Sequence, residues 1–285
     1  MSDTVATRTT SDYRAELKPI WCPGCGDHGV VNSVVKAYVK LNLDPAKLVM
    51  VSGIGCSSRL PLFIASYGLH GVHGRTLPTA TGIKAARPDL CVVAVGGDGD
   101  AYSIGAGHLP HACRRNPDIT YIVMNNSIYG LTKGQVSPTS SLHFITKSSP
   151  EGSIENPINP LEMAITYGAT FIARGFSGKP NDLAELIAAA IEHKGFAWID
   201  VISPCVTFNK QDTFDAYKEK VVPLPEDHDV SDRVQAFERA ASTNPIYLGL
   251  LLQVRKPTFE EALAERAERG LARGDTLDDL FDRYV

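Results

Sequence analysis

Short apolar runs rich in β-branched residues recur along the chain, and such runs are typical of buried strands. They lie at residues 47–52, 90–95, 119–124, 169–173 and 196–202. Stretches with helical spacing of apolar residues separate several of them, at residues 27–41, 102–115 and 181–194. Alternating strands and helices usually form right-handed crossover units, which place helices on both faces of a parallel sheet. The pattern therefore predicts a doubly wound α/β domain with a mostly parallel sheet.

Polar loops directly follow two of the predicted strands. Glycines and aspartates come after the run at 90–95, and two asparagines come after the run at 119–124. Open parallel sheets bind ligands outside the carboxyl ends of their strands, so we expect a binding site there. A longer stretch, residues 137–160, is rich in Ser, Pro, Gly, Thr and Asn and has no clear periodicity. Its composition predicts a long surface loop that can act as a lid.

The C-terminal part of the chain differs from the rest. After Val222, prolines and an acidic stretch interrupt the pattern, and one helix is predicted beyond them, at residues 257–273. This part has too few apolar residues for a core of its own. We therefore expect a main domain at 1–222 and a C-terminal arm at 223–285, which packs on the main domain or on a neighbouring subunit.

Composition and charge exclude some classes of protein. The chain has 285 residues, of which 44% are hydrophobic, and can bury a large core. Its formal net charge of −4 argues against a nucleic-acid-binding protein, which would carry a basic patch. Residues 1–16 are polar and lack the apolar centre of a signal peptide, and no apolar run is long enough to span a membrane. We expect a cytoplasmic protein that binds neither nucleic acid nor membranes.

A glycine-rich acidic segment and an asparagine pair carry the clearest chemical signal. Gly97, Asp98 and Gly99 follow one predicted strand, and Asn125 and Asn126 follow the next. Glycines let backbone N–H groups approach a phosphate closely. Twenty-five residues separate Gly99 from Asn125, enough for one helix and one strand, so both motifs should reach the same edge of the sheet. Carboxylate and amide oxygens suit Mg²⁺, which often shares its coordination with phosphates.

Each half of this motif can also be read as ordinary structure, a tight turn and the end of a strand. The spacing, together with the continuation at 128–135, favours a functional motif. The arrangement resembles the cofactor motif of thiamine-diphosphate enzymes. That resemblance implies that Mg²⁺ is held by the Asp98 carboxylate, the Asn126 side chain and the Ile128 carbonyl. Two diphosphate oxygens and a water would complete the coordination.

Six cysteines in a reducing compartment are better read as metal ligands, reactive groups or small buried side chains than as disulfides. Cys22 and Cys25 form a C-x2-C pair before a predicted helix, whereas Cys56 and Cys205 each follow a predicted strand. Such a pair can bind one metal ion or one cluster. Spacing alone leaves a structural zinc site open, although zinc sites usually contain two closely spaced pairs.

Other residues of metal-binding type are expected to pack rather than to bind. Cys91 lies in a predicted strand and Cys113 in a predicted helix, where small buried side chains are common. His108 and His111 are three residues apart on the same predicted helix, but no third ligand accompanies them.

Five motifs together give a closer resemblance. They are WCPGC at 21–25, GIGCSSR at 53–59, HGRTLPTATGIKAARPDL at 73–90, GGDGD at 96–100 and NNSIYGLTKGQ at 125–135. This set resembles the β-chains of 2-oxoacid:ferredoxin oxidoreductases, especially the 2-oxoglutarate type, over about residues 20–208. The resemblance implies a thiamine-diphosphate-binding α/β fold and one four-iron four-sulfur cluster. The cluster ligands would be Cys22, Cys25, Cys56 and Cys205.

The same resemblance implies a reaction and partners. In such enzymes a 2-oxoacid is oxidatively decarboxylated, the acyl group passes to coenzyme A, and electrons reach ferredoxin through the cluster. The substrate would be 2-oxoglutarate, giving succinyl-CoA and carbon dioxide. The glutamate that activates the aminopyrimidine ring belongs to an α-chain, so we expect an α2β2 assembly and an inactive isolated β-chain.

Further candidates are weaker and divide by role. At the cofactor we expect the motif glycines together with Asp27, Cys56, Ser57, Asp100, Leu131 and Thr132. To hold substrate carboxylate or phosphate charge we expect Arg59, His73, Arg75 and Lys133. Asp27 could equally be a helix N-cap, and exposed basic residues are often only solvated.

Two other classes of protein share part of these features. A non-redox thiamine-diphosphate decarboxylase or carboligase would have the motif from Gly97 to Ile128 without a cluster. A zinc-stapled, non-catalytic α/β binding module would have the cysteines without the cofactor. The metal content of the purified protein would distinguish the three classes: iron indicates the oxidoreductase, zinc the binding module, and neither metal the non-redox enzyme.

Overall fold

The computed structural model describes residues 7–273 and 276–284. Its centre is a sheet of eight strands in the order β2-β1-β3-β4-β6-β5-β8-β7. The strands are β1 (Leu48–Ser52), β2 (Tyr67–His70), β3 (Cys91–Gly97), β4 (Ile119–Asn125), β5 (Phe171–Phe176), β6 (Phe196–Ile202), β7 (Val221–Pro223) and β8 (Ile246–Gln253). Neighbouring strands run parallel, apart from β5 and β8, which are antiparallel.

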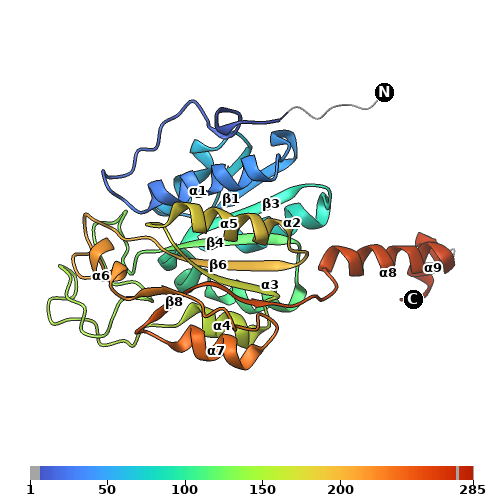
Figure 1. Ribbon diagram of the computed structural model, residues 1–285. Coiled ribbons are helices and arrows are strands. Elements are labelled where there is room, and N and C mark those ends of the chain that lie inside the picture. The colour runs from blue at the N-terminus through green and yellow to red at the C-terminus, as the bar shows by residue number, and fades with distance from the viewer. Residues whose placement is uncertain (1–6, 274–275, 285) are drawn as a thin grey trace.

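Helices cover both faces of this sheet, and each face has its own apolar core (Figure 1). On one face lie α1 (Asp27–Lys40) and α5 (Pro180–Glu192), and on the other lie α2 (Thr76–Ala86), α3 (Leu109–Arg115), α4 (Pro160–Tyr167) and α7 (Arg233–Ala241). Val93 of β3 belongs to the first core and Val92 to the second, because successive side chains of a strand point to opposite faces. The doubly wound, mostly parallel α/β fold is confirmed.

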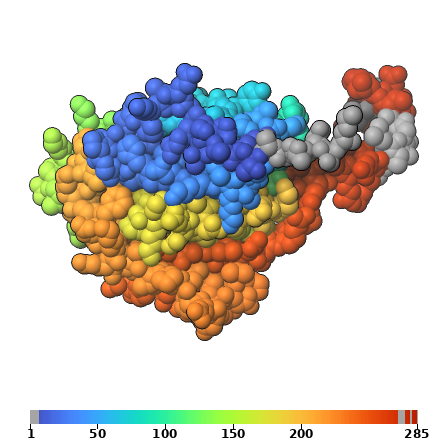
Figure 2. All heavy atoms as spheres, turned by 45° about the horizontal axis from the view of Figure 1, so that its top comes forward, coloured from blue at the N-terminus to red at the C-terminus, as the bar shows by residue number. Residues whose placement is uncertain are grey.

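The remaining helices are short or peripheral. They are α6 (Phe214–Lys218), α8 (Phe259–Arg273) and α9 (Leu277–Asp282), with the single turns Thr10–Tyr13, Pro45–Lys47, Ser57–Phe63, Asp100–Ile104 and Ala106–His108. Figure 2 shows α8 and the described part of α9 extending away from the rest of the molecule. Among the helices of the described residues, none is long and apolar enough to cross a membrane.

Every predicted strand is present, with bounds shifted by no more than three residues. The helices predicted at 27–41 and 181–194 are also confirmed as α1 and α5. The helix predicted at 102–115 is wrong in its first half. There the chain forms one π-helical turn at Asp100–Ile104 and one 3₁₀ turn at Ala106–His108, and α3 begins only at Leu109. Glycines on both sides of Ala106 and a proline in the first turn of α3 explain the interruption.

The helix predicted at 257–273 is confirmed as α8, but residues 223–285 contain further elements that were not predicted. Strand β8 is among them, and its antiparallel pairing with β5 makes it part of the central sheet. Helix α7, which precedes β8, packs against α4 with Ala236 and Ala240 buried. The division of the chain at residue 222 stays a prediction, although the sheet continues across it.

Residues 137–159 are all described and contain neither helix nor strand, as predicted for a long loop. Helix α4 follows at once, because Asn159 caps its first turn by accepting from the backbone N–H groups of Leu161 and Glu162. Gly168 ends the helix with φ of 83°, a conformation that favours glycine. Both signals are visible in the sequence, yet this helix was not predicted.

Candidate active site

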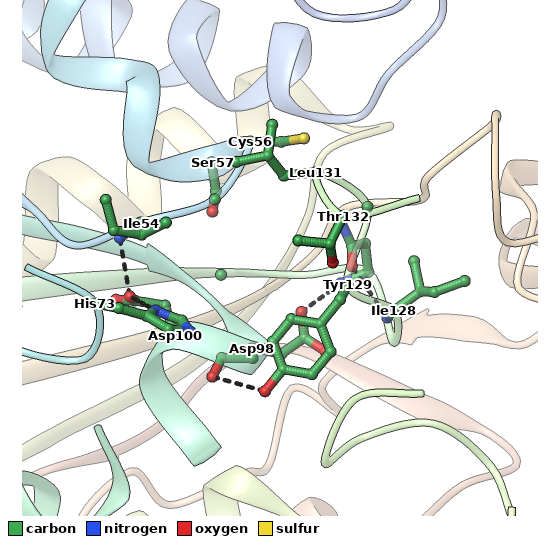
Figure 3. A pocket seen from close by; sticks show the side chains of 15 residues that line it. Ile54, Cys56, Ser57, His73, Asp98, Asp100, Ile128, Tyr129, Leu131 and Thr132 are labelled. Atoms are coloured by element: carbon green, nitrogen blue, oxygen red, sulfur yellow. Dashed lines mark hydrogen bonds and ion pairs between the residues drawn. The ribbon is translucent and has the colours of Figure 1, made fainter. Parts of the chain in front are cut away.

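The loops after β1, β3 and β4 meet at the carboxyl ends of these parallel strands and enclose a cavity of about 140 Å³ (Figure 3). Ser57 and Leu131 lie on one side of it, and Asp98 and Tyr129 lie on the other. The structure brings together nearly all of the predicted cofactor residues. The predicted residues that line the cavity are Cys56, Ser57, His73, Gly97, Asp98, Gly99, Asp100, Asn126, Ile128, Leu131 and Thr132.

Asp98 is the buried carboxylate of this cavity, with 1% of its surface exposed. Its Oδ2 accepts hydrogen bonds from Ser137 Oγ at 2.5 Å and Thr139 Oγ1 at 2.8 Å. Its Oδ1 accepts only a long bond, 3.5 Å, from the backbone N–H of Asn126. Burial raises the pKa of Asp98, and the two hydroxyl bonds partly offset that effect. One carboxylate oxygen is thus well bonded, and the other is available to a ligand.

The asparagine pair forms a tight turn beside Asp98. Asn126 Oδ1 accepts from the N–H of Ile128 at 3.1 Å, and Ser127 between them has φ of 54°. A hydrogen bond from Asn209 Nδ2 to the Asn126 carbonyl, 3.1 Å long, stabilises the turn. Asn125 faces away from the cavity and donates from Nδ2 to Asp200 Oδ1 at 3.3 Å. Carboxylate, amide and carbonyl oxygens are therefore present together, and this donor set fits Mg²⁺.

Two glycines of the cavity lining lie in close contact with neighbouring side chains. A Cβ atom at Gly97 would lie 2.8 Å from Ser57 Oγ, and one at Gly99 would lie 2.1 Å from Tyr129 Cε1. Both separations are too short for real contacts, so a side chain at either position would force the lining to move. The glycines let the Ser57 and Tyr129 side chains lie against the backbone here, and their N–H groups carry no Cβ that would keep a diphosphate away.

Asp100 lines the same cavity, but its carboxylate is occupied by the protein. Its Oδ1 accepts from the backbone N–H groups of Ile54 at 2.9 Å and Gly74 at 2.8 Å, and His73 Nδ1 lies 2.5 Å away. Asp100 therefore joins the loop after β1 to the segment before α2 and fixes the His73 ring. Its predicted contact with the cofactor stays a prediction.

The four predicted cluster cysteines line a second cavity, of about 220 Å³. Cys22 and Cys25 precede α1, Cys56 follows β1, and Cys205 follows β6. Hydrogen bonds join these loops, since the Gly26 backbone N–H donates to the Pro204 carbonyl at 3.1 Å and the Trp21 side-chain Nε1 donates to the Cys56 carbonyl at 2.7 Å. Four cysteines that are far apart in sequence thus surround one space.

The two cavities adjoin. Cys56, Asn126, Gly130 and Leu131 line both of them. A Cβ atom at Gly130 would lie 3.6 Å from Cys205 Sγ and 3.8 Å from Cys56 Sγ, so the backbone of the loop after β4 passes next to two of the sulfurs. A group in one cavity would therefore lie close to a group in the other.

Burial disfavours the charged form of two of these thiols in the absence of a bound metal or cluster. Burial raises the pKa of Cys56 to about 11 and that of Cys25 further, and the nearby Asp27 carboxylate adds to both shifts. Across the described residues, no three His, Cys, Asp or Glu side chains are grouped so that they could hold one metal ion. A zinc ion needs its sulfurs only about 2.3 Å from one centre. The cysteines are together in one cavity but are not grouped around a point.

Other predicted residues lie elsewhere. Asp27 is buried and lines neither cavity; its Oδ1 accepts from Ser203 Oγ at 2.8 Å, and burial raises its pKa to about 6. The N-cap interpretation of Asp27 is wrong, because Gly26 occupies that position. Arg59 and Lys133 line the cysteine cavity, whereas Arg75 donates to the Ile104 carbonyl at 3.1 Å.

The cysteines and histidines expected to pack line neither of the two cavities. Cys91 lies in β3, Cys113 is buried in α3, and His108 and His111 lie at the start of α3. Sequence reasoning missed Ser137 and Thr139, which contact Asp98 directly. The only signal for them was a run of hydroxyl residues a few positions after the asparagine motif.

Comparison with known proteins identifies the family to which this geometry belongs. Residues 53–201 match the family of the thiamine pyrophosphate enzyme C-terminal TPP-binding domain, and residues 205–268 match the C-terminal family of the pyruvate ferredoxin oxidoreductase β-subunit. The chain is 43% identical over 275 residues to subunit β of 2-oxoacid:ferredoxin oxidoreductase 1 of Aeropyrum pernix, covering 92% of this chain and 86% of that one. The chain belongs to the family of 2-oxoacid:ferredoxin oxidoreductase β-subunits.

Further relatives agree with this membership. The 2-oxoglutarate synthase subunit KorB of Methanocaldococcus jannaschii is 41% identical over 261 residues, covering 89% of this chain and 94% of that one. A solved 2-oxoglutarate:ferredoxin oxidoreductase from Magnetococcus marinus, with 2-oxoglutarate, coenzyme A and succinyl-CoA bound, contains a chain 48% identical to this one. The TM-score is 0.92, with 96% of this chain and 94% of that chain covered. This β-subunit therefore belongs to a thiamine-diphosphate-dependent oxidoreductase, as the sequence motifs predicted.

Proposed function

We propose that this β-subunit binds magnesium thiamine diphosphate in the cavity behind Gly97 and Gly99. Asp98 Oδ1, the Asn126 side chain and the Ile128 carbonyl would hold Mg²⁺, and the N–H groups near the two glycines would meet the diphosphate. The absence of a side chain at both glycines and the available oxygen of Asp98 support this arrangement. Thr132 and Ser57 would add hydroxyl contacts from the opposite wall.

We further propose that the cysteine cavity holds one four-iron four-sulfur cluster on Cys22, Cys25, Cys56 and Cys205. Each thiolate of such a cluster binds a different iron, so the sulfurs surround a volume and not a single point. The four cysteines that line one cavity of about 220 Å³ support this proposal. Cluster binding would also remove the thiol protons that burial holds in place at Cys25 and Cys56.

The single observation that carries the redox function is the common wall of the two cavities. When bound, thiamine diphosphate supplies an electron sink for decarboxylation of a 2-oxoacid. Cys56 and Leu131 border both cavities and leave little protein between a cofactor and a cluster. Such contact suits electron transfer from one to the other, which a non-redox decarboxylase does not need.

The chain's own residues would position the reactants. Asp100 holds His73 at the edge of the cofactor cavity, where the ring can meet phosphate or carboxylate charge. Arg59 and Lys133 line the neighbouring cavity and are proposed to hold a substrate carboxylate. Ile54 and Leu131 contribute apolar surface that limits water near the reacting carbon.

The complete reaction that we propose is coenzyme A-dependent oxidative decarboxylation of 2-oxoglutarate, with ferredoxin as the electron acceptor. The bound molecules named for the Magnetococcus marinus enzyme support this choice of substrate. An α-subunit would supply the glutamate that activates the aminopyrimidine ring, most simply in an α2β2 assembly. Reduced thiols and a low-potential cluster suit the cytoplasm.

Metal analysis of the anaerobically purified complex tests this proposal. We expect about four irons per β-chain, broad visible absorption and no zinc. Cys205→Ser should lower the iron content, and Cys91→Ser, which changes a cysteine outside the cavity, should not. A colourless, zinc-containing protein would contradict the redox function. Comparing 2-oxoglutarate with pyruvate as substrates, with a viologen acceptor, would test the substrate.

A further inference from the structure

The two oxygens of Asp98 are treated differently by the protein. Oδ2 accepts from Ser137 Oγ at 2.5 Å and from Thr139 Oγ1 at 2.8 Å, both in a buried setting. Oδ1 receives only the Asn126 N–H at 3.5 Å. Thr139 Oγ1 also lies 2.8 Å from Asn125 Oδ1, and its one proton can serve only one of these two acceptors at a time. Ser137 and Thr139 thus hold the carboxylate through Oδ2, and Oδ1 is left for a ligand.

Both hydroxyls belong to the start of the loop at 137–159, and that start is clamped to the asparagine turn. Ser140 Oγ donates to the Ser127 carbonyl at 2.6 Å and accepts from the Ser137 N–H at 2.8 Å. Ser140 is 1% exposed, so this clamp is shielded from water. The same few residues therefore hold the carboxylate and anchor the loop.

The rest of the loop closes on this anchor. The Ile158 N–H donates to the Pro138 carbonyl at 2.9 Å, which joins the two ends of the loop. Further out, the His143 N–H donates to the Ser153 carbonyl at 2.8 Å, and Ile145 and Ile154 are 64% and 90% exposed. The loop is thus a closed unit, with its joined ends near Asp98 and its middle part exposed at the surface.

We propose that Ser137 and Thr139 are positioning residues that aim Asp98 Oδ1 at a bound Mg²⁺ and make the order of the loop depend on that ion. This inference rests on the proposed cofactor site. An ion at Oδ1 would fix the orientation of the carboxylate, and Ser137 Oγ and Thr139 Oγ1 would then meet an acceptor that is already in place. Metal binding therefore strengthens both loop anchors, and by reciprocity an anchored loop strengthens metal binding.

The test uses the complete αβ complex, freed of cofactor, with Ser137→Ala and Thr139→Val combined. Mg²⁺ is titrated in saturating thiamine diphosphate, and cleavage by trypsin after the exposed Lys147 in the loop is followed by mass spectrometry. In the wild type we expect Mg²⁺ with thiamine diphosphate to slow this cleavage several-fold. In the double variant we expect Mg²⁺ affinity about 10-fold weaker and no slowing of cleavage by Mg²⁺.

Two further variants keep the test decisive. Ser148→Ala lies in the same loop and loses only an exposed contact with Thr146, so it should behave as wild type. Thr139→Ser retains the hydroxyl and should keep Mg²⁺ affinity and protection even if the double variant folds poorly. Wild-type affinity and protection in Thr139→Val would overturn the inference. Failure of the wild type to bind thiamine diphosphate at all would instead reject the cofactor site itself.

Discussion

Asp98 is a buried carboxylate and a proposed ligand of Mg²⁺. Asp98→Asn keeps the shape of the side chain but removes the negative charge that attracts a divalent cation. We expect affinity for thiamine diphosphate in the presence of Mg²⁺ to fall by about 100-fold, with iron content unchanged. Isothermal titration calorimetry would measure this affinity. The control is Asp89→Asn, which changes an exposed carboxylate paired with Arg87 and Lys47. Equal affinity in the two variants would reject Asp98 as a ligand.

Asp200 lies behind the asparagine turn and gives a prediction for stability. Burial raises its pKa from 3.8 to about 6, while the nearby Arg174, Tyr102 and Asn125 oppose that shift. The folded state therefore binds this proton more tightly than the unfolded state does. The stability that this proton gives is complete at low pH and is lost as the pH rises from about 4 through about 6.

Asp200→Asn removes this titration while keeping an oxygen that can accept from Tyr102. The unfolding free energy of the variant minus that of the wild type should therefore rise by up to about 3 kcal/mol between about pH 4 and pH 7. Chemical denaturation of the complex at several pH values would measure the difference. A difference that does not change with pH would show that Asp200 does not titrate in this range.

At the scale of elements, Gly74 joins the segment before α2 to the turn at Asp100–Ile104. Its φ is 68°, and a Cβ atom there would lie 2.6 Å from the Gly105 nitrogen. Gly74→Ala should destabilise the protein by about 1 to 3 kcal/mol. Gly82→Ala is the matched control, because Gly82 lies inside α2 with nothing within 4 Å of an added Cβ. It should be neutral or stabilising in the same thermal melts.

The elements show what the sequence could and could not predict. Strands β1, β3, β4 and β6 are continuous apolar runs because they are buried on both faces, so periodicity and β-branched composition identified them. Edge strand β2 is exposed along its length and lacks that signal. Strand β8 has an apolar run, IYLGLLLQ, that could have been recognised as a strand, but local sequence does not reveal its antiparallel pairing with β5.

The same division holds for the candidate site. Asp98 and Asn126 follow buried strands, so topology alone brings their loops to one edge of the sheet, and spacing was enough to pair them. Ser137 and Thr139 reach Asp98 only through the path of an irregular loop. No periodicity specifies such a path, so residues of this kind are found only when the packed structure is known.

At the scale of the whole molecule, the cofactor cavity lies at the carboxyl edge of the sheet and contains no carboxylate that the motifs assign to the aminopyrimidine ring. Purified β-chain should therefore bind thiamine diphosphate without decarboxylating 2-oxoglutarate. Adding the α-subunit should restore turnover with a viologen acceptor. Full activity of the β-chain alone would show that the site is complete within one chain.

Strand β8 has a consequence for how the protein behaves when it is cut. Its antiparallel pairing covers the edge of β5, whose six residues are all buried. A chain that ends at residue 222 would expose that edge as an unpaired, apolar template for other chains. Such a fragment should aggregate on expression. A chain ending after Ala262 keeps β8 and should stay monodisperse. Sedimentation velocity of the two fragments would measure their degree of association. The C-terminal segment thus protects the fold from self-association, whatever else it contacts.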